Sequence, residues 1–276
     1  MPAPQKSMLS QLGKLNFKAT AIGLPVKWTT PRGEQYTKAF AISELVNPPD
    51  AASVFLVKSP NKYHVQTQRE IGKGFADFID KISGAICDGI DKWMKLTMVS
   101  GMVINGPVGM VLPGNLTGPP LMPFILASAP VNTAQFMKYS KAIAQVVSTA
   151  WQTWQSGLMG QLMYPAFAAF PGPMAPPTPC VPMPLIAFSS PGEAMLSPAS
   201  LKAQMIANLG DPDALHHKEL FEAVAQAFNT SFTLFKATTL VQNVLGTGPI
   251  PTFAPPFVPV GPVVGGTSVP TPGVLT

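Results

Sequence analysis

Apolar side chains recur at helical spacing in three separate stretches of the chain. In the first, around residues 78–95, large apolar residues follow one another at intervals of four, four, four and three positions: Phe78, Ile82, Ile86, Ile90 and Trp93. This spacing places them on one face of an α-helix. Because a helix with one apolar face is marginal by itself in water, we expect the three helices to pack together.

The second and third stretches align with each other. KAIAQVVSTAWQTWQS, residues 141–156, shares Ala, Gln and Thr positions with EAVAQAFNTSFTLFKA, residues 222–237. Their large aromatic residues coincide in two pairs: Trp151 with Phe232 and Trp154 with Phe235. DKISGAICDGIDKWMK, residues 80–95, fits more loosely and places Trp93 at the position of Trp154. Amphipathic helices also align by chance, because they share one periodicity; an internal repeat is the hypothesis we adopt.

A Gly-Pro pair follows each helical pattern. The distances are 13 residues from Trp93 to Gly106-Pro107, 18 from Trp154 to Gly172-Pro173, and 13 from Phe235 to Gly248-Pro249. Glycine, proline and aliphatic residues continue after each pair. Proline at this density favours extended or polyproline geometry over helix, so the repeated unit is a helix followed by an extended arm.

The sequence therefore predicts a mainly α protein. Three long amphipathic helices would each be followed by a Pro/Gly-rich extended arm, in a pseudo-threefold repeat covering residues 71–250. The copies would span about residues 71–127, 132–190 and 213–265. Residues 1–70 combine β-prone runs with turn signals and predict a small β-containing N-terminal segment. Residues 251–276 predict a Pro-rich C-terminal tail.

The stretch from residue 97 to residue 127 contains no charged side chain. A membrane-spanning helix needs ~20 consecutive apolar residues with every backbone donor satisfied. Three breaks argue against one: Gly106-Pro107, Pro113-Gly114 and Gly118-Pro119-Pro120. The first residues, MPAPQKSMLSQLGK, also lack the apolar core of a secretory signal. We therefore expect no transmembrane span and no export by that route.

Composition indicates a protein that is buried in an assembly. Charged residues make up 11% of the 276 residues, hydrophobic residues 46%, and prolines number 32. An ordinary globular chain is about 25% charged. A chain with so few charges would expose apolar patches, and large patches mark partner surfaces. A tightly packed monomer with an apolar surface is the alternative.

The sequence carries no motif for catalysis, metal binding or nucleic-acid binding. His216-His217 lies near Asp211 and Asp213, but adjacent histidines on a helix point to different faces. Cys87 and Cys180 have no metal-ligand spacing and suit buried apolar positions. The net charge is +5, but the lysines are scattered and nearly all basic residues are lysine, whereas nucleic-acid grooves favour clustered arginine. We expect no enzyme activity, no cofactor, no metal and no nucleic acid.

One stretch resembles a known class of proteins. QREIGKGFADFIDKISGAICDGIDKWMKL and the following INGPVGMVLPGNLTGPPL, within residues 66–120, look like small proteins associated with phage-tail-like contractile injection machinery. The resemblance implies a structural part of a tail, baseplate or spike complex, or a cargo loaded into one. It implies no catalytic residue.

These observations favour a non-catalytic structural subunit or adaptor of a large assembly. Its partners would be other protein subunits, a trimeric spike among them, and it would be cytoplasmic during assembly and then extracellular or particle-associated. A membrane-active effector, whose apolar arms insert after delivery, is the first alternative, and an enzyme with dispersed catalytic residues is the second. The interaction and core residues predicted are Trp93, Trp151, Trp154, Phe232, Phe235, Pro107, Pro173 and Pro249. The repeat further predicts that Trp93, Trp154 and Phe235 lie buried and close together.

Overall fold

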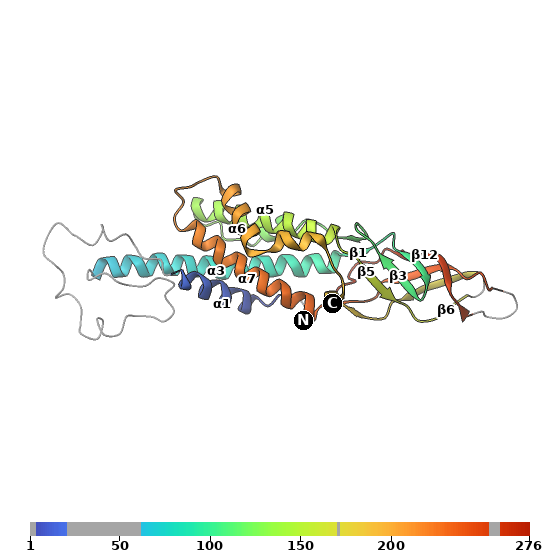
Figure 1. Cartoon of the computed structure of the whole chain (residues 1–276). Helices are drawn as coiled ribbons and strands as arrows, with labels where there is room; N and C mark the ends of the chain where they lie inside the picture. Colours follow the sequence, from blue (N-terminus) through green and yellow to red (C-terminus); the bar gives the residue numbers. More distant parts are fainter. Residues whose placement is uncertain (1–3, 21–61, 170–171, 254–259) are drawn as a thin grey trace.

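The computed structural model describes residues 4–20, 62–169, 172–253 and 260–276, and of residues 62–69 only the helical backbone. The molecule is elongated, with helices at one end and strands at the other (Figure 1). The helical end contains the three long helices α3 (Lys62–Leu96), α5 (Ala134–Ser156) and α7 (His217–Thr238). Shorter helices complete it: α1 (Lys6–Ala19), α4 (Met122–Leu126) and α6 (Pro198–Leu209), with the 3-10 segments η3 (Leu185–Ala187) and η4 (Pro191–Leu196).

Local sequence signals set the helix boundaries. Thr133 caps α5 by accepting a hydrogen bond from the Phe136 N–H at 3.1 Å. Proline occupies the first turn of α6, where its missing N–H is tolerated, and Gly210 ends that helix in the left-handed conformation. Helix α1 packs on α3 and α7, while α6 packs on α5 and α7. The two shorter helices therefore help to bring the three long ones into one bundle.

The strand end is built on a six-stranded antiparallel sheet with the order β5-β3-β2-β12-β10-β7. Its strands are β2 (Val103–Gly106), β3 (Val108–Val111), β5 (Gly160–Met163), β7 (Met174–Pro179), β10 (Leu245–Pro249) and β12 (Val263–Val269). Three two-stranded pairs accompany it: β1 (Met98–Val99) with β4 (Leu116–Thr117), β6 (Phe167–Ala168) with β11 (Val260–Gly261), and β8 (Met183–Pro184) with β9 (Leu240–Val241).

The prediction of a mainly α protein, in which each of three long helices is followed by an extended arm, is therefore wrong. The arms pair with one another into the six-stranded sheet, and only their combination supplies the backbone partners that each arm lacks. Prolines are tolerated because they lie at turns, at strand ends or on β7, where fewer ladder donors are needed. The expected β-containing N-terminal segment is also not observed in its described part, since residues 6–19 form α1. The β-prone runs between residues 21 and 61 lie outside the described residues.

Each long helix leads into one pair of strands. We call residues 97–121, which follow α3, arm 1; residues 157–190, which follow α5, arm 2; and residues 239–276, which follow α7, arm 3. Each arm has an outgoing strand, which leaves the helices, and a returning strand. Arm 1 contributes β2 and β3, arm 2 contributes β5 and β7, and arm 3 contributes β10 and β12.

The two strands of arm 1 and the two strands of arm 3 are paired neighbours, whereas those of arm 2 are linked by one hydrogen bond beyond the end of β7. Strands β2 and β3 pair directly, as do β10 and β12. In arm 2, the Val181 N–H just beyond β7 donates to the Met163 carbonyl of β5 at 2.7 Å. Because β5 and β7 are the two edges of the sheet, this bond brings the edges together. Outgoing and returning strands consequently alternate around a closed circuit, with two strands from each arm.

The seams between the arms begin in the same register, after which the β10–β7 and β12–β2 ladders each contain a register shift and the β3–β5 ladder does not. Returning strands start directly after the pairs Gly106-Pro107, Gly172-Pro173 and Gly261-Pro262. Their first residues pair with the last residue of the neighbouring outgoing strand: Val108 with Met163, Met174 with Pro249, and Val263 with Gly106. We expected Gly248-Pro249 to be the third Gly-Pro pair of the repeat. That prediction is wrong, because Pro249 ends an outgoing strand and Pro262 occupies the position equivalent to Pro107 and Pro173.

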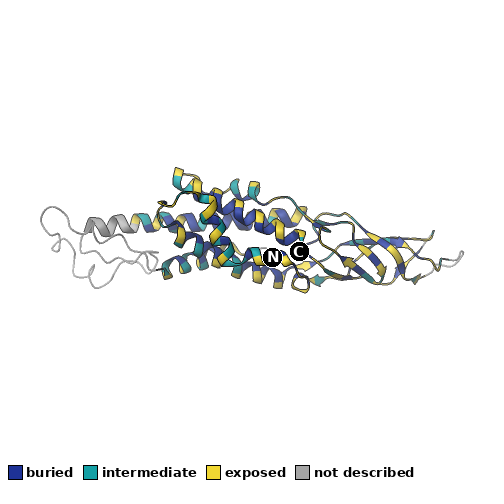
Figure 2. Ribbon diagram, turned by 45° about the horizontal axis from the view of Figure 1, so that its top comes forward, coloured by how far each residue is buried: buried dark blue, intermediate teal, exposed yellow. Residues whose placement is uncertain are grey.

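A contiguous core runs through both ends of the molecule, from Leu9 in α1 to Leu275 near the C-terminus. Buried residues lie along the inward faces of the helices and alternate with exposed ones along the strands (Figure 2). Inside the sheet, Tyr164 is 4% exposed and donates its hydroxyl to the Val244 carbonyl at 3.2 Å. A Cβ added at Gly109 or Gly246 would lie within 3 Å of the Tyr164 ring. The interior of the sheet is therefore filled by side chains.

Candidate functional site

The structure brings the five predicted aromatic residues together where the bundle meets the sheet. Trp93, Trp151, Trp154, Phe232 and Phe235 are each at most 2% exposed. Ring centroids are 5.0 Å apart for Trp93 and Trp151, 5.2 Å for Trp154 and Phe232, and 5.6 Å for Trp151 and Phe235. The Trp93 and Trp154 centroids are 6.1 Å apart. Trp93, Trp154 and Phe235 thus belong to one buried cluster, which Trp151 connects.

Hydrogen bonds attach this cluster to arm 1. The Trp93 Nε1–H donates to Gln155 Oε1 at 2.8 Å, and Gln155 Nε2 donates to the Gly118 carbonyl at 3.1 Å. Gln155 is itself buried, and its bond to Trp93 is buried while its bond to Gly118 is partly buried. The aromatic cluster is therefore a packing centre that fixes how the arms leave the helices.

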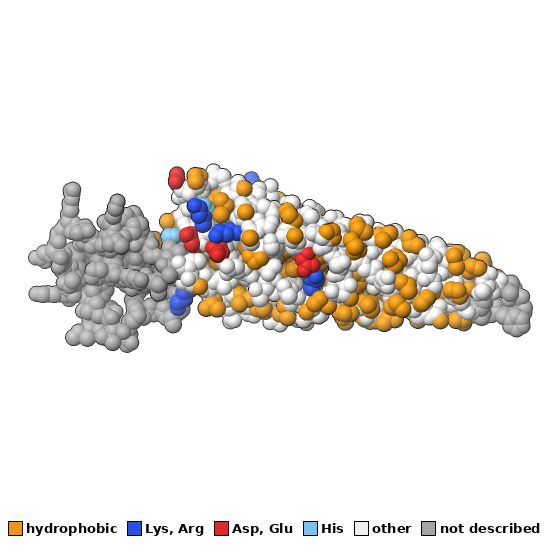
Figure 3. All heavy atoms as spheres, viewed as in Figure 1, with side chains coloured by type: hydrophobic (Ala, Val, Ile, Leu, Met, Phe, Trp, Pro, Cys, Tyr) orange, Lys and Arg blue, Asp and Glu red, His pale blue; other side chains and the backbone are white. Residues whose placement is uncertain are grey.

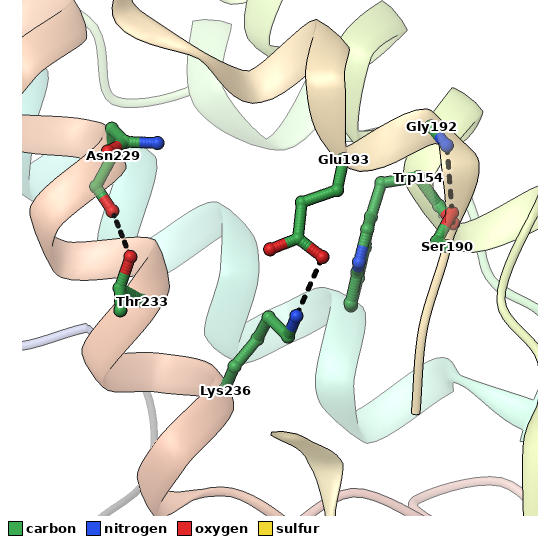
Figure 4. A network of polar contacts seen from close by, with 7 residues as sticks. All are labelled: Trp154, Ser190, Gly192, Glu193, Asn229, Thr233 and Lys236. Carbon is green, nitrogen blue, oxygen red and sulfur yellow. Dashed lines mark hydrogen bonds and ion pairs between the residues drawn. The ribbon is translucent and has the colours of Figure 1, made fainter. Parts of the chain in front are cut away.

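A polar network beside the cluster joins η4 to α5 and α7 (Figure 4). Ser190 Oγ donates to the Trp154 carbonyl at 2.7 Å and accepts from the Gly192 N–H at 3.1 Å. The Lys236 ammonium pairs with Glu193 Oε2 at 2.7 Å, and Lys236 is only 8% exposed. Its nitrogen also lies 5.9 Å from the centre of the Phe232 ring. The charges of Lys236 and Glu193 are paired with each other and connect α7 to η4. The network therefore stabilises the packing of these elements.

The three predicted prolines lie elsewhere, at the far end of the sheet. Pro107 connects β2 to β3, and its carbonyl accepts from the Tyr164 N–H at 2.8 Å. Pro249 ends β10 and pairs with Met174, the residue that follows Pro173. The predicted interaction and core residues are thus divided between two places, the junction and the tip.

Among the described residues, the histidines and cysteines singled out from the sequence do not form a metal-binding cluster. No group of three or more His, Cys, Asp or Glu side chains there could hold a metal ion. His217 is buried with its Nδ1 2.7 Å from the Ala214 carbonyl, and burial lowers the pKa of His216. Burial raises the pKa of Cys87 to about 12, so its thiol is protonated at neutral pH.

An open groove of about 1050 Å³ lies beside the contact between α1 and α3 and is lined by residues of both helices. Two of its carboxylates have basic partners: Asp80 pairs with Lys14 at 2.9 Å, and Asp91 pairs with Lys95 at 2.6 Å. The Asp91–Lys95 pair is exposed within one helical turn and stabilises little, whereas Asp80 also accepts a hydrogen bond from Ser10. Ser10 also lines the groove and donates its hydroxyl to Asp80, so this carboxylate is shared between Ser10 and Lys14.

The most unusual surface is the whole strand end, which we call the uncharged end. Its three arms, residues 97–121, 157–190 and 239–276, contain no Asp, Glu, Lys, Arg or His. On the face seen in Figure 3, charged side chains gather over the helices, and hydrophobic side chains extend over the rest. Large apolar side chains are exposed on all three arms: Val103, Met110, Leu112, Met159, Met163, Met174, Val181, Ile186, Leu240, Val260 and Val264.

Sequence reasoning found the lack of charge in residues 97–127 but missed the closed sheet that this stretch helps to form. The equivalence of Gly261-Pro262 was also missed, although a signal was present. Gly106-Pro107-Val108 and Gly261-Pro262-Val263 read identically as Gly-Pro-Val. The distance of 13 residues from Phe235, equal to that from Trp93 to Gly106, instead predicted Gly248-Pro249.

No helix of the described residues is both long and apolar enough to cross a membrane. Comparison of the chain with known protein families, with curated proteins and with solved structures finds no match. The surface chemistry and the geometry of the uncharged end are therefore the observations on which a function can be argued.

Proposed function

We propose that the chain is a non-catalytic structural subunit of a large protein assembly, in which other subunits cover its uncharged end. The observation that carries this proposal is the complete lack of charged residues in the three arms together with exposed apolar side chains on each of them. A surface that normally faces water carries charges, which keep proteins soluble and apart.

Burial of such a surface is energetically favourable. Each Å² of apolar area removed from water contributes roughly 25 cal/mol. Burying charges in an interface, by contrast, carries a desolvation penalty that their mutual attraction often only balances. Burial of the uncharged end therefore gains the free energy of apolar burial without the cost of desolvating charges. The helical end, where Lys, Asp and Glu gather, suits contact with water.

The assembly that fits best is a phage-tail-like contractile injection apparatus. The stretch within residues 66–120 that resembles proteins of such machinery covers most of α3 and arm 1. A rod with one charged end and one uncharged end suits a position in a tail, baseplate or spike. The protein would then be made in the cytoplasm and become part of the particle.

A membrane-active effector is the second candidate, because exposed apolar side chains also suit hydrocarbon. Polar side chains on the same surface argue against it: Asn105, Gln161 and Thr267 are exposed on strands of the sheet. In hydrocarbon such groups lose their hydrogen bonds to water, whereas a protein surface can replace them. Flotation with neutral phosphatidylcholine vesicles distinguishes the two candidates, since only the effector would float with the lipid.

Sedimentation of the tagged chain from lysates of the organism that produces it tests the proposal. We expect the wild-type chain to sediment with a large particle. Val264→Lys places a charge on β12 within the covered surface and should shift the chain to the free fraction, because an unpaired charge buried in an interface is strongly unfavourable. Leu15→Lys, at an exposed position of α1, is the matched control and should still sediment with the particle.

Circular dichroism of both purified variants shows whether each one folds. Wild-type chain that sediments only as a monomer would contradict the proposal. So would a folded Val264→Lys chain that remains in the particle as efficiently as wild type.

A further inference from the structure

The backbone of the uncharged end repeats three times around the closed circuit of strands. Each arm contributes one outgoing and one returning strand in the same rotational order, arm 1 beside arm 3, arm 3 beside arm 2, and arm 2 beside arm 1. Each seam joins the returning strand of one arm to the outgoing strand of the next. A single chain thus presents the strand arrangement that three identical chains would give by symmetry.

Hydrogen bonds at the tip follow the same repeat. The Tyr164 N–H donates to the Pro107 carbonyl, and the Ile250 N–H donates to the Pro173 carbonyl, both at 2.8 Å. Each donor directly follows the last residue of an outgoing strand. In the third seam that position is Pro107, which has no N–H. The seams therefore begin in the same register at the tip, and the third lacks this hydrogen bond because proline has no N–H.

Exposed apolar side chains are also present on all three returning strands, at the third residue of β3, the first of β7 and the second of β12. Every returning strand carries one that is 39% to 52% exposed: Met110 on β3, Met174 on β7 and Val264 on β12. The surface is thus apolar on all sides of the sheet, and it carries no charge on any side. A partner that covers it must surround it and must itself be uncharged where the two meet, because a facing charge would be desolvated without a counter-charge.

We propose that this partner is a homotrimeric protein with an apolar, uncharged socket, whose threefold axis coincides with the axis of the closed sheet. This inference rests on the proposed function and specifies the partner of the same surface. Three identical subunits around an axis present the same patch three times, so each subunit can contact one arm in the same way. One chain would bind per trimer.

Site-specific photo-crosslinking in the tagged assembly, isolated from the producing organism, tests the symmetry of the partner. The photoreactive residue p-benzoylphenylalanine replaces Met110, Met174 or Val264 in three separate variants of the full chain. We expect all three to crosslink to the same peptide of the same partner protein. Leu15 replaced in the same way on α1 is the control, and it should not crosslink to that peptide. Native mass spectrometry of the isolated complex should give three partner copies per chain.

The outcomes separate the two proposals. Crosslinks from the three arms to unrelated peptides, or a partner ratio other than three to one, would overturn the threefold socket and leave the structural role standing. If none of the three positions crosslinks to protein while the chain remains in the particle, the uncharged end is not covered and the proposed function itself fails. Crosslinks to lipid from all three positions would overturn both and support insertion into a membrane.

Discussion

At the residue scale, Trp93 and Trp154 share one aromatic cluster and one degree of burial but differ in hydrogen bonding. Trp93 Nε1 donates to buried Gln155, whereas Trp154 Nε1 has no partner among the described residues. We expect Trp93→Phe to lower the free energy of unfolding by ~1–3 kcal/mol more than Trp154→Phe, because only the first leaves a buried acceptor unpaired. Urea denaturation of the two variants measures this difference directly.

The two substitutions remove similar ring volumes, so each controls for the packing loss of the other. Equal destabilisation by both would show that the bond to Gln155 contributes nothing to stability. Trp154→Ala, which empties a fully buried site, should lower the free energy of unfolding by ~3–5 kcal/mol.

At the element scale, the attachment of α1 to α3 depends on pH through Asp80. Burial alone would raise the pKa of this carboxyl, but hydrogen bonds from Ser10 and Lys14 outweigh burial and hold the pKa below its usual value of 3.8. The folded pKa therefore lies below the unfolded one, and the ionised form stabilises the fold above about pH 4. That contribution is lost as the pH falls through the folded pKa. We expect the difference in stability between wild type and Asp80→Asn, measured by urea denaturation, to shrink between pH 6 and pH 3.

Asp91→Asn is the matched control for Asp80→Asn. Asp91 also pairs with a lysine, Lys95, but within one exposed helical turn, and such pairs contribute little. Its substitution should change the stability only slightly at either pH. A difference between wild type and Asp80→Asn that stays constant with pH would contradict the assignment of the acid sensitivity to Asp80.

At the scale of the whole molecule, the shared core predicts that both ends unfold together. A Cβ on Gly248 would lie 2.4 Å from Val263 Cγ1 and 2.5 Å from the Gly266 Cα, so β10 and β12 would have to move apart. We expect Gly248→Ala to lower stability by ~1–3 kcal/mol through overpacking. Because one cluster of buried residues connects sheet and bundle, the melting of helices and strands should shift by the same amount. Circular dichroism and the infrared amide band follow the two separately.

Gly172→Ala is the control, since nothing lies within 4 Å of an added Cβ there. It should leave the melting temperature nearly unchanged. Loss of the strand signal at a lower temperature than the helical signal, in the Gly248→Ala chain, would show instead that the two ends are separate folding units.

The sequence by itself determined the elements that depend on local spacing. The apolar positions from Phe78 to Trp93 predicted the later part of α3, and the Ala/Gln/aromatic patterns around Trp151 and Phe232 predicted α5 and α7. A helix makes its backbone hydrogen bonds within itself, so a few turns of sequence are enough to predict it. The lack of charge in residues 97–127 was equally visible, because it is a property of composition.

Only the tertiary structure decided what the arms form and which Gly-Pro pair completes the repeat. A strand takes its backbone partners from distant segments, as Gly106 does from Val263 and Met163 does from Val108, and nothing local to either strand encodes that choice. The strands of the six-stranded sheet are only four to seven residues long, and prolines lie close to them, so their local sequence predicts extended arms and not a sheet. Their pairing depends on all three arms coming together in the folded molecule. The uncharged end as a surface, with its apolar side chains exposed on every side, exists only once that closure has been made.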